Sequence, residues 1–259
     1  MKFSLKNKIA VVTGGGSGIG KAISKTFAHQ GAKVHILDFN FEGAQETILE
    51  IEKFGGTGKA HRCDVSNQKN VTDVISTISK EETISILVNN AGIAHVGNIE
   101  AVEEEDLDRL YNVNIKGVYN CIKASIPSLK EKGGGVILNL ASIGSTVGLN
   151  DRFAYSMSKG AVLTMTYSIA KDYINDGIRC NCIAPGRVHT PFVDGFIKNN
   201  YPGKEEEMFE KLSKTQPIGR MGSTQEIADL VLFLCSDEAG FITGSNYPID
   251  GGFVTLNGK

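Results

Sequence analysis

Short runs of apolar, often β-branched residues alternate with longer segments of helical period along the 259-residue chain. The runs predict strands at residues 9–13, 33–38, 59–63, 84–89, 135–141, 178–184 and 246–249. Between them, apolar positions three and four residues apart predict helices at residues 19–30, 41–54, 71–79, 104–129, 154–175 and 225–236. Strands that are apolar throughout are buried on both faces, as in a parallel sheet covered by helices. The pattern therefore predicts an α/β fold, a doubly wound parallel sheet with helices on both faces.

One stretch, residues 188–216, departs from this regular order. It follows a predicted strand, contains Pro191 and Pro202, and mixes aromatic with charged residues. A long irregular segment in a compact domain is often an active-site lid, so we expect a substrate lid at about 188–216. Since no repeat, low-complexity tract or linker interrupts the chain, residues 1–259 are expected to form a single domain.

Composition narrows the possible partners. Lys and Arg number 27 against 29 Asp and Glu, so the net charge of −2 argues against nucleic acid or an anionic membrane as partner. The first apolar run is too short for a signal segment or a membrane span. The five cysteines lack Cys-x-x-Cys spacing and are expected to be small buried groups in a reducing compartment, without a metal site. We therefore expect a cytoplasmic protein whose partner is a small molecule.

A glycine-rich loop at residues 13–20 joins the first predicted strand to the first predicted helix. Glycines there allow a tight turn and close backbone approach, and the helix N-terminus offers free N–H groups to a pyrophosphate. The run Gly15 to Lys21 nearly matches the phosphate loop of nucleotide triphosphatases, but that motif requires Ser or Thr next, where this chain has Ala22. A glycine-rich turn without a ligand is the other alternative.

Asp38 ends the second predicted strand, about 20 residues beyond the loop, where an acidic side chain can bond the adenosine ribose hydroxyls of NAD. The same carboxylate would repel the 2′-phosphate of NADP. No Arg or Lys lies within residues 13–20 or directly after Asp38 to offset that repulsion. The sequence therefore predicts NAD as cofactor, with a turn-forming role for Asp38 as the alternative.

Tyr155 and Lys159 are four residues apart in a predicted helix, so their side chains share one face. A phenol titrates near pH ~10, and a neighbouring cation favours phenolate and lowers that pKa. The pair is a candidate device for proton transfer. Taken alone, however, such a pair often only lines a solvated helix face.

In order along the chain, these segments resemble the short-chain dehydrogenase/reductase family over nearly its whole length. The resemblance includes the loop at 13–20, Asp64-Val65, Asn89-Asn90-Ala91-Gly92 and the segment from Pro185 to Thr190. It implies a Rossmann-like fold and an NAD-dependent oxidoreductase that interconverts a secondary alcohol and a ketone, or a sugar hemiacetal and a lactone. The cofactor-binding residues that it implies are Gly14, Ser17, Gly18, Ile19, Gly20, Asp38, Asp64, Val65, Asn90, Ala91, Gly92, Tyr155, Lys159, Pro185, Gly186, Val188 and Thr190.

The resemblance also implies a catalytic set of Asn114, Ser142, Tyr155 and Lys159. Tyr155 would take or give the hydroxyl proton. Lys159 would stabilise the phenolate and bond the nicotinamide ribose, and Ser142 would bond the substrate oxygen and align it for hydride transfer. Asn114 would anchor a water that passes protons onward from Lys159.

The substrate is predicted less directly. Arg152, near Tyr155, resembles an arginine of cytosolic-type 3-hydroxybutyrate dehydrogenases of the family that is associated with the substrate carboxylate. Together with Ser142 and Tyr155, the substrate residues that we expect are Arg152, His95, Arg187 and His189. They favour a sugar, sugar acid or hydroxy acid. The alternative is that Arg152 lies on the surface, or pairs with Asp151 or with a neighbouring subunit. The family resemblance also implies a homotetramer.

Two rival functions stay open. A 3-oxoacyl-(acyl carrier protein) reductase shares this motif order, but such enzymes usually prefer NADPH and carry a basic residue where this chain has Ser17 or Asp38–Phe39. A non-catalytic cofactor-binding protein could use the same fold. Such proteins typically lack the Tyr or the Lys, whereas this chain has both Tyr155 and Lys159.

Overall fold

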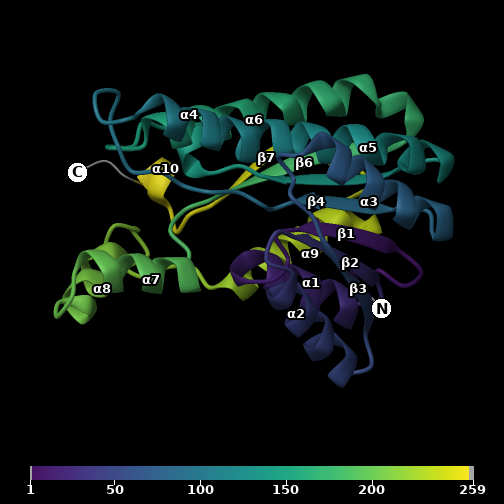
Figure 1. Cartoon of the computed structure of the whole chain (residues 1–259), viewed down its shortest axis with the longest axis horizontal. Coiled ribbons are helices and arrows are strands. Elements are labelled where there is room, and N and C mark those ends of the chain that lie inside the picture. The colour runs from purple at the N-terminus through teal and green to yellow at the C-terminus, as the bar shows by residue number, and fades with distance from the viewer. Residues whose placement is uncertain (1, 257–259) are drawn as a thin grey trace.

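The computed structural model describes residues 2–256, which contain one parallel sheet of seven strands in the order β3-β2-β1-β4-β5-β6-β7 (Figure 1). The predicted doubly wound α/β fold is confirmed. The strands are β1 (Ile9–Thr13), β2 (Lys33–Asp38), β3 (Thr57–Arg62), β4 (Ile86–Asn89), β5 (Gly135–Leu140), β6 (Ile178–Pro185) and β7 (Asn246–Ile249). The longer helices are α1 (Gly18–His29), α2 (Phe41–Lys53), α3 (Gln68–Glu81), α4 (Glu104–Leu110), α5 (Gly117–Glu131), α6 (Phe153–Asp172), α7 (Pro191–Asn200), α8 (Glu205–Ser213) and α9 (Thr224–Cys235), with a short α10 (Phe253–Leu256).

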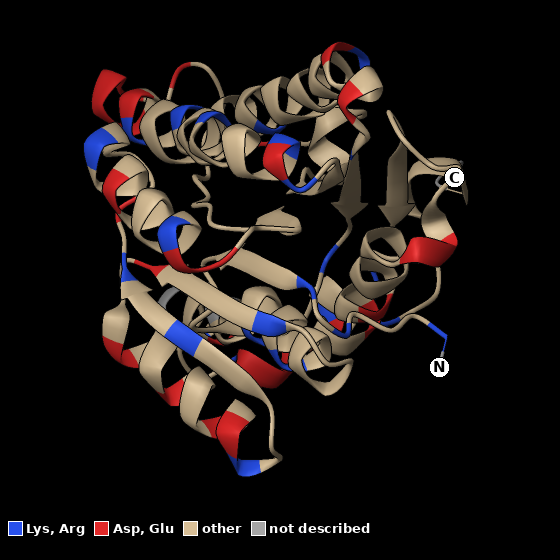
Figure 2. Ribbon diagram, turned by 90° about the vertical axis from the view of Figure 1, so that its right-hand side faces the viewer, with Lys and Arg blue, Asp and Glu red and all other residues tan. Residues whose placement is uncertain are grey.

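The alternation of side chains along each strand divides the core into two layers. In β1, Ala10 and Val12 pack toward α1, α2 and α9, whereas Val11 packs toward α3, α5 and α6. Figure 1 shows these two groups of helices on opposite faces of the sheet. The five cysteines are free and buried, as expected. Figure 2 shows acidic and basic positions interspersed along the helices, and no helix in residues 2–256 has the length and apolar character to cross a membrane.

Several predicted boundaries were displaced by a few residues. The third strand begins at residue 57 instead of 59, and the fourth begins at 86 instead of 84. The predicted helix at 104–129 is continuous but changes type, because a π-helical segment, η1 (Tyr111–Lys116), separates α4 from α5. The predicted helix at 154–175 ends as α6 at residue 172 and is followed by the 3₁₀ turn η3 (Ile174–Asp176).

The expectation of irregular structure at 188–216 was wrong, because α7 and α8 occupy much of it. The local signals are those of helix starts. Thr190 caps α7 by accepting a hydrogen bond from the Val193 N–H (3.4 Å), and Pro191 occupies the first turn, where its missing N–H costs nothing. α8 begins with three acidic residues that complement its dipole. In Figure 1 the two helices project from the body of the molecule beyond the carboxyl ends of the strands.

Two histidines form a polar chain at the β3 edge of the sheet. His35 Nε2 lies 2.6 Å from the Glu82 carboxylate, and His35 Nδ1 lies 2.9 Å from His61 Nε2. Lys33 pairs with the other oxygen of Glu82. The complete set of hydrogen bonds requires a neutral His35 ring, because His35 donates from Nε2 to Glu82 and accepts at Nδ1 from His61. Burial is the main cause that lowers the pKa of His35, and it lowers the pKa of His61 to about 4, with the charges of His35 and Lys59 adding to that effect.

From the hydrogen bonds among Glu82, His35 and His61 we expect the protein to lose stability in mild acid. The pKa of His61 is depressed from an unfolded value near ~6.5, so the unfolded state binds more protons below that pH. The contribution is fully present above pH ~6.5 and is lost as the pH falls toward 4. Urea titrations from pH 7.5 to 4 measure the free energy of unfolding. We expect its decrease over this range to be smaller in His61→Gln than in the wild-type protein, by on the order of 2 kcal/mol. The exposed His29→Gln is the control, and an unchanged pH dependence in His61→Gln would contradict the assignment.

Candidate active site

The predicted site residues gather at the carboxyl edge of the sheet, since the loops that carry them follow β1, β2, β4, β5 and β6 of a parallel sheet. The strand order reverses between β1 and β4, which are neighbours. In doubly wound sheets, ligands bind in the crevice at such a reversal. The fold thus brings these loops to the edge of the sheet where such proteins bind their ligands.

The glycine loop after β1 is built for close backbone approach. Gly14 and Gly18 have φ angles of +65° and +51°, which residues other than glycine rarely adopt. A Cβ on Gly20 would lie 2.1 Å from the Gly14 carbonyl oxygen. Ser17 begins α1 without a side-chain cap, so N–H groups of the first turn are left for an anion. This geometry fits the pyrophosphate of a dinucleotide.

The loop after β4 is tied to the glycine loop. The Asn90 side chain donates to the carbonyl oxygens of Thr13 and Gly14, both at 3.0 Å. The backbone N–H groups of Asn90 and Ala91 both donate to Thr13 Oγ1 at 3.0 Å. Thr13 therefore organises the site, although its place in the sequence marks it only as the start of the glycine loop. Its hydroxyl next to Gly14 was the signal that could have marked it.

Asp38 lies at the end of β2 with both carboxylate oxygens engaged. Oδ2 accepts from the Gly16 N–H and Oδ1 from the Asn40 N–H, each at 2.8 Å. The negative charge is thus fixed beside the glycine loop, where the sequence places the adenosine ribose. Asp64, after β3, uses its carboxylate to accept from the N–H and hydroxyl of Ser66 (2.9 and 2.7 Å).

The segment from Pro185 to Thr190 returns to the glycine loop from the other side. A Cβ on Gly18 would be 3.7 Å from Thr190 Cγ2. A Cβ on Gly186 would be 2.8 Å from the backbone Cα of Asp250 and 2.5 Å from Gln216 Oε1, so a larger residue could not fit without moving the backbone. Val188 is 7% exposed and belongs to the hydrophobic core, so its side chain anchors the segment and only its backbone is available to a ligand.

Tyr155, Lys159 and Ser142 meet where β5 and α6 approach. The Lys159 ammonium is buried and donates to the Leu140 carbonyl at 2.7 Å, and it lies 6.0 Å from the centre of the Tyr155 ring. Ser142, just after β5, is hydrogen-bonded to the Tyr155 side chain. A phenol, a hydroxyl and an ammonium thus lie together in one corner at the carboxyl edge of the sheet.

Burial dominates the electrostatics of this corner. It lowers the pKa of Lys159 to about 8, and it raises the pKa of Tyr155 above its usual value. The hydrogen bond from Ser142 and the positive charge of Arg152 act in the opposite direction on Tyr155. The groups that favour the phenolate in this structure are therefore Ser142 and Arg152, whereas the spacing along the helix had pointed to Lys159.

Asn114 lies in the π-helical segment η1 and is almost fully buried. Its Oδ1 accepts from the Ile93 N–H, and its Nδ2 donates to the Ile93 carbonyl and to Ser158 Oγ, all at 2.9 Å. Both amide hydrogens are thus used by protein atoms. Any anchoring of a water, as the family resemblance implies, has to use other atoms of this residue.

The predicted substrate residues differ in how they are partnered. The two histidines have acidic partners: His95 lies 3.1 Å from Asp106, and His189 lies 2.7 Å from Asp194 and packs against Phe209 of α8. His189 therefore belongs to the base of the α7–α8 segment.

The two arginines have no carboxylate partner within residues 2–256. Arg152 donates to the Asp151 carbonyl (2.8 Å), and Arg187 donates to the Thr215 hydroxyl (3.4 Å). Burial lowers the pKa of Arg187, and the charge of Arg152 lowers it further, so the two guanidinium groups influence each other. The surface-pair alternative for Arg152 with the Asp151 carboxylate is not seen in the described chain.

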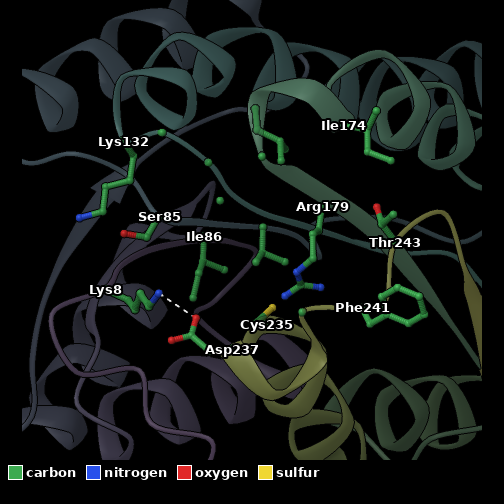
Figure 3. A pocket seen from close by; sticks show the side chains of 17 residues that line it. Lys8, Ser85, Ile86, Lys132, Ile174, Arg179, Cys235, Asp237, Phe241 and Thr243 are labelled. Carbon is green, nitrogen blue, oxygen red and sulfur yellow. Dashed lines mark hydrogen bonds and ion pairs between the residues drawn. The ribbon is translucent and has the colours of Figure 1, made fainter.

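A cavity of about 670 Å³ lies at the opposite, amino end of the sheet (Figure 3). Its charged residues serve the fold: Lys8 pairs with Asp237 at 3.0 Å, and Arg179 donates to the carbonyls of Leu234, Ser236 and Ile242. None of the predicted site residues lines it. Residue chemistry and strand order, and not cavity size, identify the candidate active site.

Comparison with known proteins agrees with this geometry. A family model described as enoyl-(acyl carrier protein) reductase matches residues 14–254. Dehydrogenase/reductase SDR family member 6 of Aquarana catesbeiana is 39% identical, over 96% of this chain and 98% of its own. Cyclohexanol dehydrogenase of Acinetobacter sp. is 34% identical, over 98% of both chains. The structure of L-sorbose reductase from Gluconobacter frateurii, complexed with NADPH and L-sorbose, superposes with a TM-score of 0.94 at 29% identity, covering 99% of this chain and 100% of that one.

The glycine loop gives a test of cofactor binding. Gly20→Ala would force a Cβ against the Gly14 carbonyl and the Asn90 amide, 2.1 and 2.4 Å away, and so displace the loop. We expect the dissociation constant for NADH, measured by fluorescence titration, to rise at least about tenfold, as when backbone hydrogen bonds to an anionic ligand are lost. Gly160→Ala is the control, because a Cβ there meets no atom within 4 Å. Equal affinities of the two variants would refute the predicted role of the loop.

Proposed function

The chain belongs to the short-chain dehydrogenase/reductase family and is an oxidoreductase acting on CH–OH donors, and from this premise we propose an NAD-dependent enzyme for a small acidic substrate. The reaction interconverts a secondary alcohol and a ketone, or a sugar hemiacetal and a lactone. The substrate belongs to the sugar acids or hydroxy acids. The observation that carries the proposal is the corner formed by Ser142, Tyr155 and Lys159, with two arginines nearby.

The bound dinucleotide supplies the acceptor or donor of the hydride. The Tyr155 hydroxyl takes the proton of the substrate hydroxyl during oxidation and returns it to the carbonyl oxygen during reduction. Ser142 hydrogen-bonds the same oxygen and orients it. Ser142 and Arg152 favour the deprotonated form of Tyr155. Lys159, fixed by the Leu140 carbonyl, bonds the nicotinamide ribose.

The preference for NAD rests on Asp38. Its carboxylate is held by the N–H groups of Gly16 and Asn40 and cannot turn away from a 2′-phosphate without losing both hydrogen bonds. Arg62 lies opposite Asp38 in the strand register, but it is engaged with Glu42 (2.9 Å). The structure of L-sorbose reductase contains NADPH. For this chain, the fixed carboxylate of Asp38 supports NAD.

The acidic substrate rests on the two arginines. Arg152 is presented by a strained turn, since Asp151 has φ +55° and its carbonyl accepts from both Gly97 N (2.9 Å) and Arg152 Nη1. Arg187 is partly buried and influenced by Arg152. Two neighbouring cations without an anion repel each other, and a substrate carboxylate between them would relieve that repulsion and accept charge-assisted hydrogen bonds.

Two further features follow by analogy with the family. We infer that the segment 188–216, with α7 and α8, is a lid over the substrate. We also infer a homotetramer in the cytoplasm. Its interfaces would cover the apolar side chains exposed on η1, α5, α6 and beside β7, which are Tyr111, Tyr119, Phe153, Met157, Tyr167 and Phe241.

The substrate class can be tested with a panel of sugars, sugar acids and hydroxy acids, with NAD⁺ and detection of NADH. We expect acidic substrates to be oxidised and Tyr155→Phe to lose about 10²–10⁴-fold in turnover. Arg152→Met and Arg187→Met should each raise KM for the best acid by about tenfold or more, because each variant loses a charge-assisted hydrogen bond to the substrate carboxylate. Lys69→Met, at an exposed position on α3, is the control. No response to any sugar acid or hydroxy acid would overturn the substrate class, and unchanged KM values would remove the carboxylate role of the arginines.

Cofactor preference can be tested at Asp38. We expect the wild-type enzyme to have at least about tenfold higher kcat/KM with NAD⁺ than with NADP⁺, because two like charges near 4 Å repel by roughly 4 kcal/mol at an effective dielectric constant of 20. Asp38→Asn keeps the size of the side chain and should erase most of this ratio. If the wild-type enzyme prefers NADPH, the 3-oxoacyl-(acyl carrier protein) reductase becomes the better assignment.

A further inference from the structure

Ser158, the residue before Lys159, carries a hydroxyl to which neither the motifs nor the relatives' names assign a role. It is fully buried in the first turns of α6. Its Oγ accepts a hydrogen bond from Asn114 Nδ2 (2.9 Å) and donates one to the Tyr155 carbonyl (2.7 Å). One hydroxyl thus joins a predicted catalytic side chain to the backbone of another.

These bonds form part of a longer path. The Ile93 N–H and carbonyl, in the loop after β4, both bond the Asn114 side chain at 2.9 Å. Asn114 then bonds Ser158, and Ser158 bonds the Tyr155 backbone. The path runs from the loop beside the glycine-rich turn, through the π-helical segment η1, to the start of α6. Every link is closed by atoms of the protein.

This hydrogen-bond path holds Tyr155 and Lys159 in place, because both amide hydrogens of Asn114 are needed for it. Its two amide hydrogens go to the Ile93 carbonyl and to Ser158 Oγ. If Ser158 lost its hydroxyl, one buried N–H of Asn114 would have no acceptor, which is costly enough to make the side chain turn or the helices separate. The Tyr155 carbonyl would at the same time lose the hydroxyl that donates to it.

We propose that Ser158 is a positioning residue, which sets the placement of Tyr155 and Lys159 against Asn114 through this hydrogen-bond path. The inference rests on the proposed catalytic role of Tyr155. Ser158 does not touch the reacting atoms. It acts by keeping the first turn of α6 in register with η1, and errors of about 1 Å in such placement can cost on the order of 10²-fold in rate.

The test compares Ser158→Ala with Ser125→Ala in the full-length enzyme. Ser125 is a fully buried serine of α5 whose Oγ has no hydrogen-bond partner in the described chain. We expect Ser158→Ala to lower kcat by about 10- to 100-fold, because Tyr155 loses its alignment. The dissociation constant for NADH should change less than about threefold. Ser125→Ala should keep kcat near the wild-type value.

A double-mutant cycle with Asn114→Ala separates positioning from general stability. If both side chains act through one path, Asn114→Ala/Ser158→Ala should have the same kcat as Asn114→Ala alone. Additive losses, or a kcat for Ser158→Ala no lower than for Ser125→Ala, would overturn the proposal. Tyr155→Phe is measured in parallel: full activity of that variant would overturn the proposed function itself, whereas an inactive Tyr155→Phe with an active Ser158→Ala would overturn only this inference.

Discussion

The active site depends on the burial of one ammonium group. Lys159 lies inside the protein with no carboxylate in ion-pair contact among residues 2–256, and the Leu140 carbonyl is its hydrogen-bond partner there. Burial of a charge without a counter-ion is unfavourable, which is why the pKa of Lys159 falls to about 8. The surrounding structure has to be rigid to keep such a group in place. Its neighbours are accordingly small or firmly bonded: a Cβ on Gly92 would lie 3.4 Å from Nζ and 3.2 Å from Asn114 Oδ1.

The same burial gives the corner its chemical properties. A lysine with a pKa of about 8 and a tyrosine with a raised pKa both have weakened preferences for their charged forms. Ser142 and Arg152 offset this for Tyr155 from two sides. Arg152 is therefore connected to both halves of the proposed function, because it favours the phenolate and is proposed to bind the substrate anion. A carboxylate bound as proposed would neutralise Arg152 and so couple the charge of the substrate to proton transfer at Tyr155.

The part of the candidate site that is expected to bind the cofactor depends on close backbone contact between loops and not on a buried charge. Gly14, Gly18 and Gly20 let the β1–α1 turn approach the β4 loop and Thr190, and Asn90 bonds the two loops together. Asp38 adds a fixed negative charge at the outer end of this surface. The hydrogen bonds of Asn90, Asn114 and Ser158 then link the cofactor side to the catalytic helix.

The sequence by itself determined the fold class and predicted the residues of the candidate site, because both depend on local patterns. Apolar periodicity marks the strands and helices, and Gly14–Gly20, Asp38 and Tyr155/Lys159 occupy fixed positions relative to strand ends. It could not show the helices α7 and α8, since Pro191 was taken as a break although it can also begin a helix. Only the tertiary structure decided that η1 is π-helical, that Ser158 joins Asn114 to Tyr155, and that Ser142 and Arg152 favour the phenolate. Asn114 and Ser158 are 44 positions apart in the chain, and local spacing does not encode a contact over such a separation. The electrostatics of Tyr155 depend on its burial, which local spacing does not encode either.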